Sequence, residues 1–161
     1  MLLSAGWSRV ASFMDGRSPN RILTSCLLGV IVSLLLVGWV SHTPIRHLIQ
    51  VMPACIIAAL AWRGVRWSHA AALPVFLIWM FLMTLIWLYL LKIAGVITGT
   101  FSPTEILLTI TIAISSIVGI AFVFRGRDGA RWSSRLLGFL VGAVFQIAAV
   151  WLSFQPAFAR R

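Results

Sequence analysis

Charged residues are scarce in this sequence, and acidic residues are almost absent. Only 10% of the 161 residues are charged and three are acidic, whereas about a quarter of a soluble domain is charged. Hydrophobic residues reach 61%, and the mean hydropathy is +1.03. These values exclude an ordinary soluble domain, and they exclude a disordered chain more firmly, because disordered chains contain few hydrophobic residues. The composition is typical of a chain that spans a lipid bilayer.

Motifs of the common enzyme and metal-binding classes are also missing. There is no Walker loop, no dinucleotide-binding glycine pattern, no HExxH and no GxSxG. The two cysteines, Cys26 and Cys55, belong to no CxxC or Cys/His cluster, so neither a metal site nor a disulfide framework is supported. We expect both to be buried, inert thiols. There is no inverted repeat, and no connector is long enough for a soluble domain.

Positive charge is the one kind that is present, with a net charge of +10 from 13 basic residues. In a soluble protein this excess would suggest nucleic acid as a partner. Here the basic residues lie in short connectors between apolar blocks, where they hold loops in the cytoplasm and meet anionic lipid headgroups. We therefore expect a bilayer with anionic headgroups as the partner, and no nucleic acid.

Five apolar blocks of about 18 to 22 residues follow one another along the chain. They cover residues 22–40, 45–62, 70–91, 104–124 and 136–154. Helices of this length cross a hydrocarbon core of roughly 30 Å, and the blocks lack the alternation of membrane strands. The second block is weaker, because polar residues occupy its first turns. We predict an all-α integral membrane protein with a five-helix transmembrane bundle over 22–154, between a cytoplasmic segment 1–21 and a short outer tail 155–161.

The distribution of basic residues predicts the orientation. Five spans with the N-terminus inside place nine basic residues in the cytoplasm and four outside. If the second block were re-entrant, the split would be six against seven. Because positive residues near span ends prefer the cytoplasm, we expect five spans with the N-terminus inside and the C-terminus outside, in a bacterial inner membrane.

The first 14 residues place Leu3, Trp7, Val10 and Met14 at helical spacing. They predict a short amphipathic helix in the headgroup region, although a frayed tail fits the pattern equally well.

Most tryptophans support the predicted spans. Five lie at or just beyond block ends, where an indole prefers the membrane interface: Trp39, Trp62, Trp67, Trp132 and Trp151. Trp79 and Trp87 lie inside the third block instead. We expect these two to pack against neighbours or lipid rather than to form a ligand cage.

The three histidines do not suggest a metal or haem site. His42 and His47 lie at the outer end of the second block, and His69 lies at the inner start of the third, a whole membrane away. His42 and His47 are five residues apart, about 140° around a helix, which is poor for joint ligation. We therefore expect no metal and no cofactor.

Polar residues gather near the outer ends of the predicted spans. The expected cluster comprises His42, Arg46, His47, Gln50, Lys92 and Glu105. Pro53, one turn deeper, removes a helix hydrogen bond and can kink the second span. Such a rim could hold a lipid phosphate, a quinone headgroup or a partner helix. The alternative is that these are ordinary interface residues that extend to the headgroups.

Glu105 is the only acidic residue expected at bilayer depth, which suggests a proton relay or ion coupling. It also ends the sequence Ser102-Pro103-Thr104-Glu105 directly before an apolar run. This sequence matches a capping box with Ser at N-cap, Pro at N1 and Glu at N3. The capping box explains every residue of the motif, and we prefer it to the chemical role.

Small residues recur every fourth position in four blocks, which lets helices approach closely in lipid. The expected packing stripes are Ser25, Gly29 and Ser33; Ala54 and Ala58; Thr111, Ser115 and Gly119; and Gly138, Gly142 and Gln146. Since five helices need only some of these faces internally, we expect the last stripe to face a second subunit.

These observations leave three classes of function. We expect a small non-catalytic accessory or assembly subunit that packs against a membrane protein partner or forms a homo-oligomer. The alternatives are an oligomeric small transporter or channel, and a membrane enzyme or a lipid- or quinone-headgroup binder at the outer rim. An enzyme would need an acid or nucleophile beside His47, and the sequence shows none at close spacing. No motif points to one family.

Overall fold

A computed structural model of the chain describes residues 20–96, 99–125 and 131–155. Within these ranges the chain is helical and contains no strand. The helices are α2 (Arg21–Val40), α3 (Pro44–Trp62), α4 (Ser68–Leu90), α5 (Pro103–Arg125) and α6 (Trp132–Ser153). The amphipathic N-terminal stretch, and the tail beyond residue 155, lie outside the described residues.

All five helices are long and apolar enough to cross a membrane. The weaker second block is among them, because α3 begins directly at Pro44 and runs without a break through Pro53 to Trp62. The predicted all-α bundle of five long apolar helices is confirmed. The orientation of its ends stays a prediction.

Three successive helices, α2, α3 and α4, each end in the same type of turn. In α2 the N–H of His42 donates to the carbonyl of Trp39, and the N–H of Thr43 donates to that of Gly38. This is a Schellman motif, which requires a left-handed residue directly after the helix cap. The left-handed residues after α2, α3 and α4 are His42 (φ 56°), Gly64 (φ 68°) and Lys92 (φ 58°). His42 and Lys92 therefore lie in turns that cap their helices.

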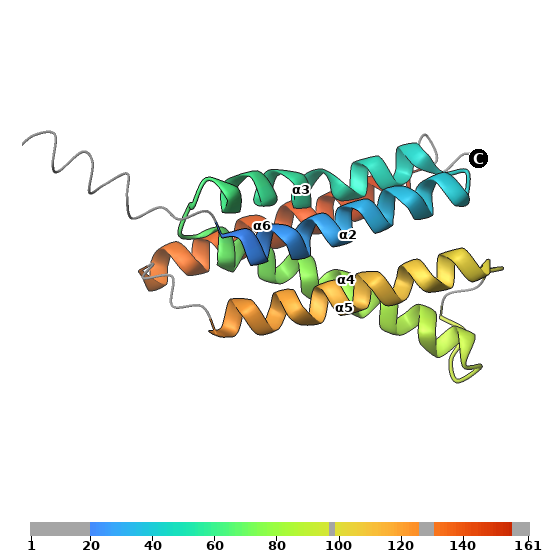
Figure 1. Ribbon diagram of the computed structural model, residues 1–161. Coiled ribbons are helices and arrows are strands. Elements are labelled where there is room, and N and C mark those ends of the chain that lie inside the picture. The colour runs from blue at the N-terminus through green and yellow to red at the C-terminus, as the bar shows by residue number, and fades with distance from the viewer. Residues whose placement is uncertain (1–19, 97–98, 126–130, 156–161) are drawn as a thin grey trace, which may run out of the picture.

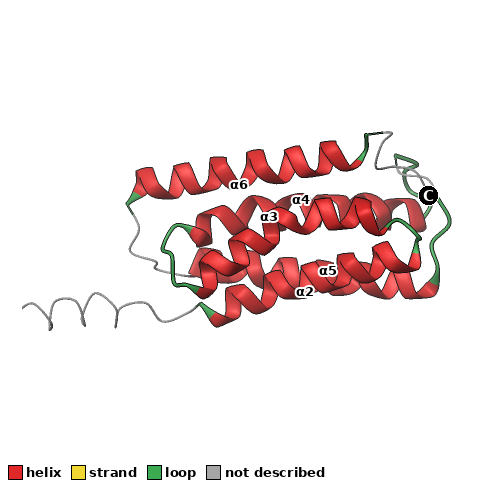
Figure 2. Cartoon of the chain, turned by 90° about the horizontal axis from the view of Figure 1, so that it is seen from above, coloured by secondary structure: helices red, strands yellow, loops and turns green. Residues whose placement is uncertain are grey.

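The helices pack side by side as a bundle (Figure 1). α2 contacts α3 and α5, α6 contacts α3 and α4, and α4 contacts α5 and α3. In Figure 2, α6 lies along α3 and α4 on the side away from α2 and α5. At one end the C-terminal half of α4 diverges from α2 and α3.

Close approach between helices depends on glycines. A Cβ added at Gly29 would lie 2.6 Å from the Oγ of Ser115, so α2 and α5 meet at this point. A Cβ at Gly138 would lie 2.9 Å from the carbonyl oxygen of Trp67, and one at Gly142 would overlap that of Ala71. Small residues therefore bring the α6 backbone directly against the chain that leads into α4.

The stripe of Gly138, Gly142 and Gln146 is buried inside the subunit. The expectation that it faces a second subunit is wrong. Gly138 and Gly142 pack against Trp67 and Ala71 at the start of α4, and Gln146 bonds to α3.

Two other stripes are shorter than expected. Ser25 and Thr111 are exposed, whereas Ser33 and Gly119, at the other ends of the same stripes, are buried. The reason is geometric, since a step of four residues turns the helix by about 40° beyond a full circle. A stripe of three such residues therefore rotates out of the interface at one end. Ala54 and Ala58 are both buried, as expected.

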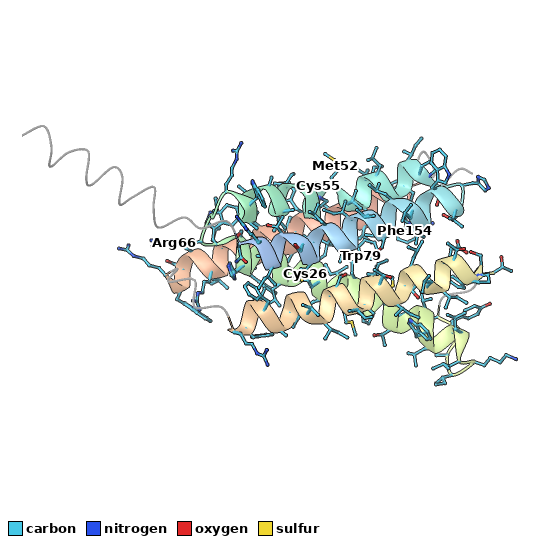
Figure 3. All side chains as sticks on the ribbon, viewed as in Figure 1. Cys26, Met52, Cys55, Arg66, Trp79 and Phe154 are labelled. Atoms are coloured by element: carbon cyan, nitrogen blue, oxygen red, sulfur yellow. The ribbon has the colours of Figure 1, made fainter. Side chains whose placement is uncertain are left out.

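The two cysteines differ in environment (Figure 3). Cys26 is buried in the core, whereas Cys55 is exposed on the surface of α3. The expectation of two buried thiols is therefore wrong for Cys55. The cause is its position on α3: Cys55 lies about 100° around the helix from the buried Ala54, on the same exposed face as Met52 and Ala59.

Candidate binding pocket

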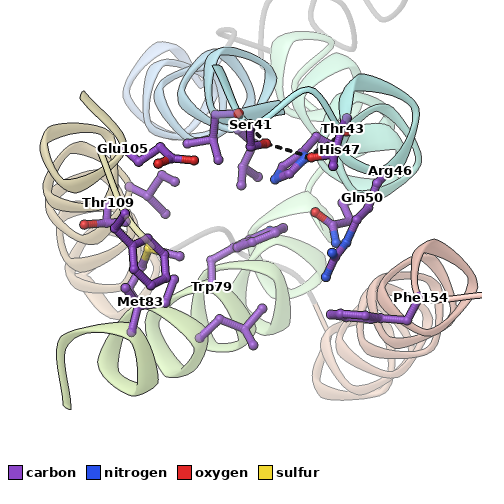
Figure 4. Close-up of a pocket in the computed structure, with 16 residues that line it drawn as sticks. Ser41, Thr43, Arg46, His47, Gln50, Trp79, Met83, Glu105, Thr109 and Phe154 are labelled. Carbon is purple, nitrogen blue, oxygen red and sulfur yellow. Dashed lines mark hydrogen bonds between the residues drawn. The ribbon is translucent and has the colours of Figure 1, made fainter. Parts of the chain in front are cut away.

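A cavity of about 500 Å³ lies at the end of the bundle where α4 diverges from α2 and α3. Successive helices run in opposite directions, so the C-terminal ends of α2, α4 and α6 meet the N-terminal ends of α3 and α5 here (Figure 1). Its apolar wall is formed by Leu34, Val37, Leu82, Met83, Ile86 and Ile112. Its polar and aromatic wall is formed by Ser41, Thr43, Arg46, His47, Gln50, Trp79, Phe101, Glu105, Thr109 and Phe154. The cavity thus combines hydrocarbon walls with charged groups (Figure 4).

Arg46 supplies the positive charge of the pocket. It is the third residue of α3, and its guanidinium carbon lies 4.0 Å from the centroid of the Phe154 ring, in cation–π contact. Phe154 follows the last turn of α6, so this contact holds the guanidinium at the pocket wall. The Nε atom is buried and has no hydrogen-bond partner within the described residues. The stacking on Phe154 therefore positions the guanidinium of Arg46, while its Nε–H donor makes no hydrogen bond within the described residues.

Trp79 supplies a second unused donor. It comes from the middle of α4, and its indole points into the pocket (Figure 4). The side chain is only 3% exposed, and its buried Nε1 has no hydrogen-bond acceptor in the part of the chain that the structure describes. A buried indole N–H ordinarily finds an acceptor. Trp79 therefore packs against its neighbours as expected, but it also lines the polar cavity.

His47 presents a hydrogen-bond acceptor to the pocket. Its Nδ1 lies 3.1 Å from the backbone carbonyl of Thr43, which can only accept, so Nδ1 carries the proton. The Thr43 hydroxyl, 3.2 Å from the same nitrogen, is bonded in turn to Ser41 (Figure 4). In a neutral ring the opposite nitrogen, Nε2, then has a free lone pair, and this edge of the ring faces the pocket.

Gly38 makes room for the imidazole. A Cβ added at Gly38 would lie 2.8 Å from the Cβ of His47 and 3.0 Å from its Nδ1. Any larger residue at this position of α2 would therefore displace the ring from Thr43.

Glu105 both caps α5 and lines the pocket. Its Oε2 accepts from the Ser102 N–H at 2.7 Å and from the Ser102 hydroxyl at 2.9 Å, while Ser102 Oγ accepts from the Glu105 N–H at 3.3 Å. The predicted capping box is therefore confirmed. A carboxylate has about four acceptor positions, so the cap leaves acceptor capacity toward the pocket.

A buried polar link joins α3 and α6 below the pocket. The Gln50 amide donates to Ser153 Oγ at 2.8 Å, and the Gln146 amide donates to the backbone carbonyl of Gln50 at 3.3 Å. Ser153 in turn donates to its own helix at Val150, 2.6 Å away. Because Gln50 lies one turn after Arg46, these bonds hold the helix that carries Arg46 against the helix that ends at Phe154.

The structure brings four members of the predicted rim together: Arg46, His47, Gln50 and Glu105 all line the cavity. His42 and Lys92 do not line it, because each occupies the left-handed position of a helix-ending turn. Among the described residues no ion pair joins Arg46 to Glu105, although both face the same cavity.

Sequence reasoning missed Trp79, Phe154 and Thr109 as pocket residues. Each belongs to an apolar span, and only the arrangement of the helices turns it toward the cavity. The position of Trp79 well inside its span, rather than at an end, was the one signal that the sequence offered.

No group of three His, Cys, Asp or Glu side chains within residues 20–96, 99–125 and 131–155 is placed to hold a metal ion. Comparison with protein-family models, with curated proteins and with solved structures finds no match to this chain.

Proposed function

We propose that this protein is a binding protein of the bacterial inner membrane that holds the phosphate of an amphiphile's headgroup in the pocket at the outer ends of its spans. The observation that carries the proposal is that two side chains lining one cavity, Arg46 and Trp79, each have a buried N–H donor (Nε and Nε1) without an acceptor among the described residues. A buried donor without a partner costs about 1–3 kcal/mol, and more when it is charged. An anionic oxygen that reached these donors would remove this cost.

The start of α3 supports an anion at the same wall. The helix begins with Pro44, and the side chain of its N-cap residue, Thr43, accepts no hydrogen bond from a backbone N–H of the first turn. The positive end of the helix dipole therefore faces the region of Thr43 and Arg46, both of which line the cavity.

The rest of the cavity supports an amphiphile. Aliphatic side chains of α2, α4 and α5 form its deeper wall, and its volume of about 500 Å³ is within the range of small-molecule sites, about 300–1,000 Å³. A ligand with hydrocarbon beside its headgroup would contact both kinds of wall.

Binding is favoured over catalysis by the surroundings of His47. The hydroxyls of Ser41 and Thr43 lie on the Nδ1 side of the ring, within the network that holds it. The accepting Nε2 therefore has no hydroxyl to activate among these neighbours. The accessory-subunit and transporter roles stay predictions, and a headgroup-binding role is compatible with the first.

Native mass spectrometry of the full chain in mild detergent tests the proposal. The probes are didecanoyl phospholipids and didecanoyl glycerol, which has the same tails without the phosphate. We expect the phospholipids to bind at least about tenfold more tightly, and Arg46→Gln to abolish the difference, because a charge-assisted hydrogen bond contributes about 1.5–3 kcal/mol. Lys92→Gln, which removes a basic residue at the same end but outside the pocket, should bind like the wild type.

Equal binding of didecanoyl glycerol and phospholipid would overturn the proposal, as would an Arg46→Gln variant that binds like the wild type. Water-soluble glycerol phosphate, added as a separate probe, distinguishes a lipid site from a phosphate site. Binding of glycerol phosphate as tight as that of the phospholipids would overturn the amphiphile part of the proposal.

A further inference from the structure

The donors and acceptors of the pocket lie on different sides. Arg46, whose guanidinium stacks on the Phe154 ring at the end of α6, and Trp79 on α4 each carry a buried N–H donor without an acceptor among the described residues. Glu105 lies across the cavity on α5, with His47 between it and Arg46 (Figure 4). The cavity therefore has a donor side formed by α3, α4 and α6, and an acceptor side formed by α5 and the His47 ring.

The acceptor side fits an ammonium group. His47 Nε2 is the unprotonated nitrogen, since Nδ1 is committed to the Thr43 carbonyl. The Glu105 carboxylate adds negative charge, and its bonds to Ser102 leave acceptor capacity toward the cavity. A primary ammonium has three N–H donors, enough to reach both groups.

The two charges lie in one partly buried cavity but do not meet each other. Arg46 stacks on Phe154, and Glu105 is held by Ser102. Each is therefore held by its own side of the pocket, and among the described residues no ion pair joins them. A ligand that carries both signs would satisfy both charges in place, whereas a purely anionic headgroup would leave Glu105 facing like charge.

We infer, on the basis of the proposed function, that the pocket selects a zwitterionic headgroup, in which a phosphate faces Arg46 and Trp79 and a primary ammonium faces Glu105 and His47. The chemical class is the phosphoethanolamine headgroup of a lipid. Phosphoglycerol offers no cation to Glu105. Phosphocholine has a cation without N–H donors, so it cannot bond to His47 Nε2.

Glu105→Gln separates this inference from the capping role of the same residue. Gln at N3 also completes a capping box, because its side-chain oxygen still accepts from the Ser102 N–H. The variant therefore keeps the helix end but removes the charge. A thermal unfolding curve in the same detergent that matches the wild type would verify that the fold is kept.

The experiment is competition between didecanoyl phosphatidylethanolamine, phosphatidylglycerol and phosphatidylcholine for the full chain, followed by native mass spectrometry. In the wild type we expect the ethanolamine lipid to be preferred about tenfold over each of the others. Glu105→Gln should bring this preference close to one while phospholipid still binds better than didecanoyl glycerol. Lys92→Gln should keep the preference.

The outcomes distinguish this inference from the proposed function. If all three phospholipids bind equally and Arg46→Gln weakens them all, the zwitterion inference is overturned and the proposal of phosphate binding stands. If phospholipids and didecanoyl glycerol bind alike, both are overturned. If soluble glycerophosphoethanolamine binds as tightly as the lipid, the zwitterion chemistry holds but its source is not a lipid.

Discussion

Substitution of Gly142 by alanine should force α6 away from α4. The added Cβ would lie 3.0 Å from both the Cα and the carbonyl carbon of Ala71 and would overlap its oxygen, whereas ordinary contact begins at 3.4 Å. These are backbone atoms in the first turn of α4, so no side-chain rotation can relieve the overlap. α6 must therefore move by about 0.5–1 Å, a gap that removes a quarter to a half of the dispersion energy of the atoms that separate.

We expect Gly142→Ala to lower the free energy of unfolding by about 1–2 kcal/mol. Overpacking of this kind costs about 1–3 kcal/mol, and the better helix propensity of alanine offsets up to about 1 kcal/mol. The folded-to-unfolded ratio should therefore fall about 5- to 30-fold. Reversible unfolding in mixed detergent and dodecyl sulfate micelles, followed by circular dichroism, measures this difference.

Gly95→Ala is the matched control, because a Cβ at Gly95 would meet no atom within 4 Å. It should leave the free energy of unfolding within about 0.5 kcal/mol of the wild type. If Gly142→Ala proved as stable as Gly95→Ala, the close contact between α4 and α6 would be refuted.

The same displacement should uncouple Gln146. Its 3.3 Å bond to the Gln50 carbonyl is already long, so a retreat of about 0.5 Å by α6 takes it beyond hydrogen-bond distance. In the Gly142→Ala background Gln146→Leu should therefore cost less than it does in the wild type. Simple additivity of the two substitutions would contradict this coupling.

Three further substitutions test other parts of the structure. Lys92→Gly should raise the free energy of unfolding by about 0.5–1 kcal/mol in the same assay, because glycine adopts φ 58° without the cost that a side chain has there; a loss of stability would contradict this. Gly38→Ala should weaken phospholipid binding in native mass spectrometry, since the added Cβ would displace the His47 ring. Unchanged binding would show that phospholipid binding does not depend on the position of this ring. Gly119→Ala should lower stability by about 1–3 kcal/mol, because its Cβ would overlap the ring of Phe76, which is fully buried; a variant as stable as the wild type would show that the ring can move aside.

The helices themselves could be predicted from the chain. Long apolar runs predict spans in any arrangement, because backbone polar groups in hydrocarbon must be satisfied within a helix. The predicted spans agree with the observed helices to within four residues at each end, and the largest difference is at α6, which begins at Trp132 instead of residue 136. The capping box at Ser102 was also predictable, since all its bonds are local.

The composition of the pocket was predictable only in part. Arg46, His47 and Gln50 fall on the first turns of one helix, and Glu105 starts another at the same end, so their common level followed from the order of the spans. The order of the spans did not predict that these side chains converge on one cavity, or that His42 is absent from it. The left-handed backbone of His42 depends on how α2 turns into α3, which hydrophobic patterning does not encode.

The amino-acid sequence by itself determined that five apolar helices form, where each begins and ends to within four residues, and at which end their polar residues gather, because these properties depend on hydropathy and on bonds between near neighbours. Only the tertiary structure decided which helix faces meet. It placed the Gly138 and Gly142 stripe inside the subunit and turned Trp79 and Phe154 toward Arg46. The physical reason is that every face of such a helix is apolar, so in a bilayer the choice of partner depends on close packing between backbones and on a few polar contacts rather than on burial of hydrophobic surface.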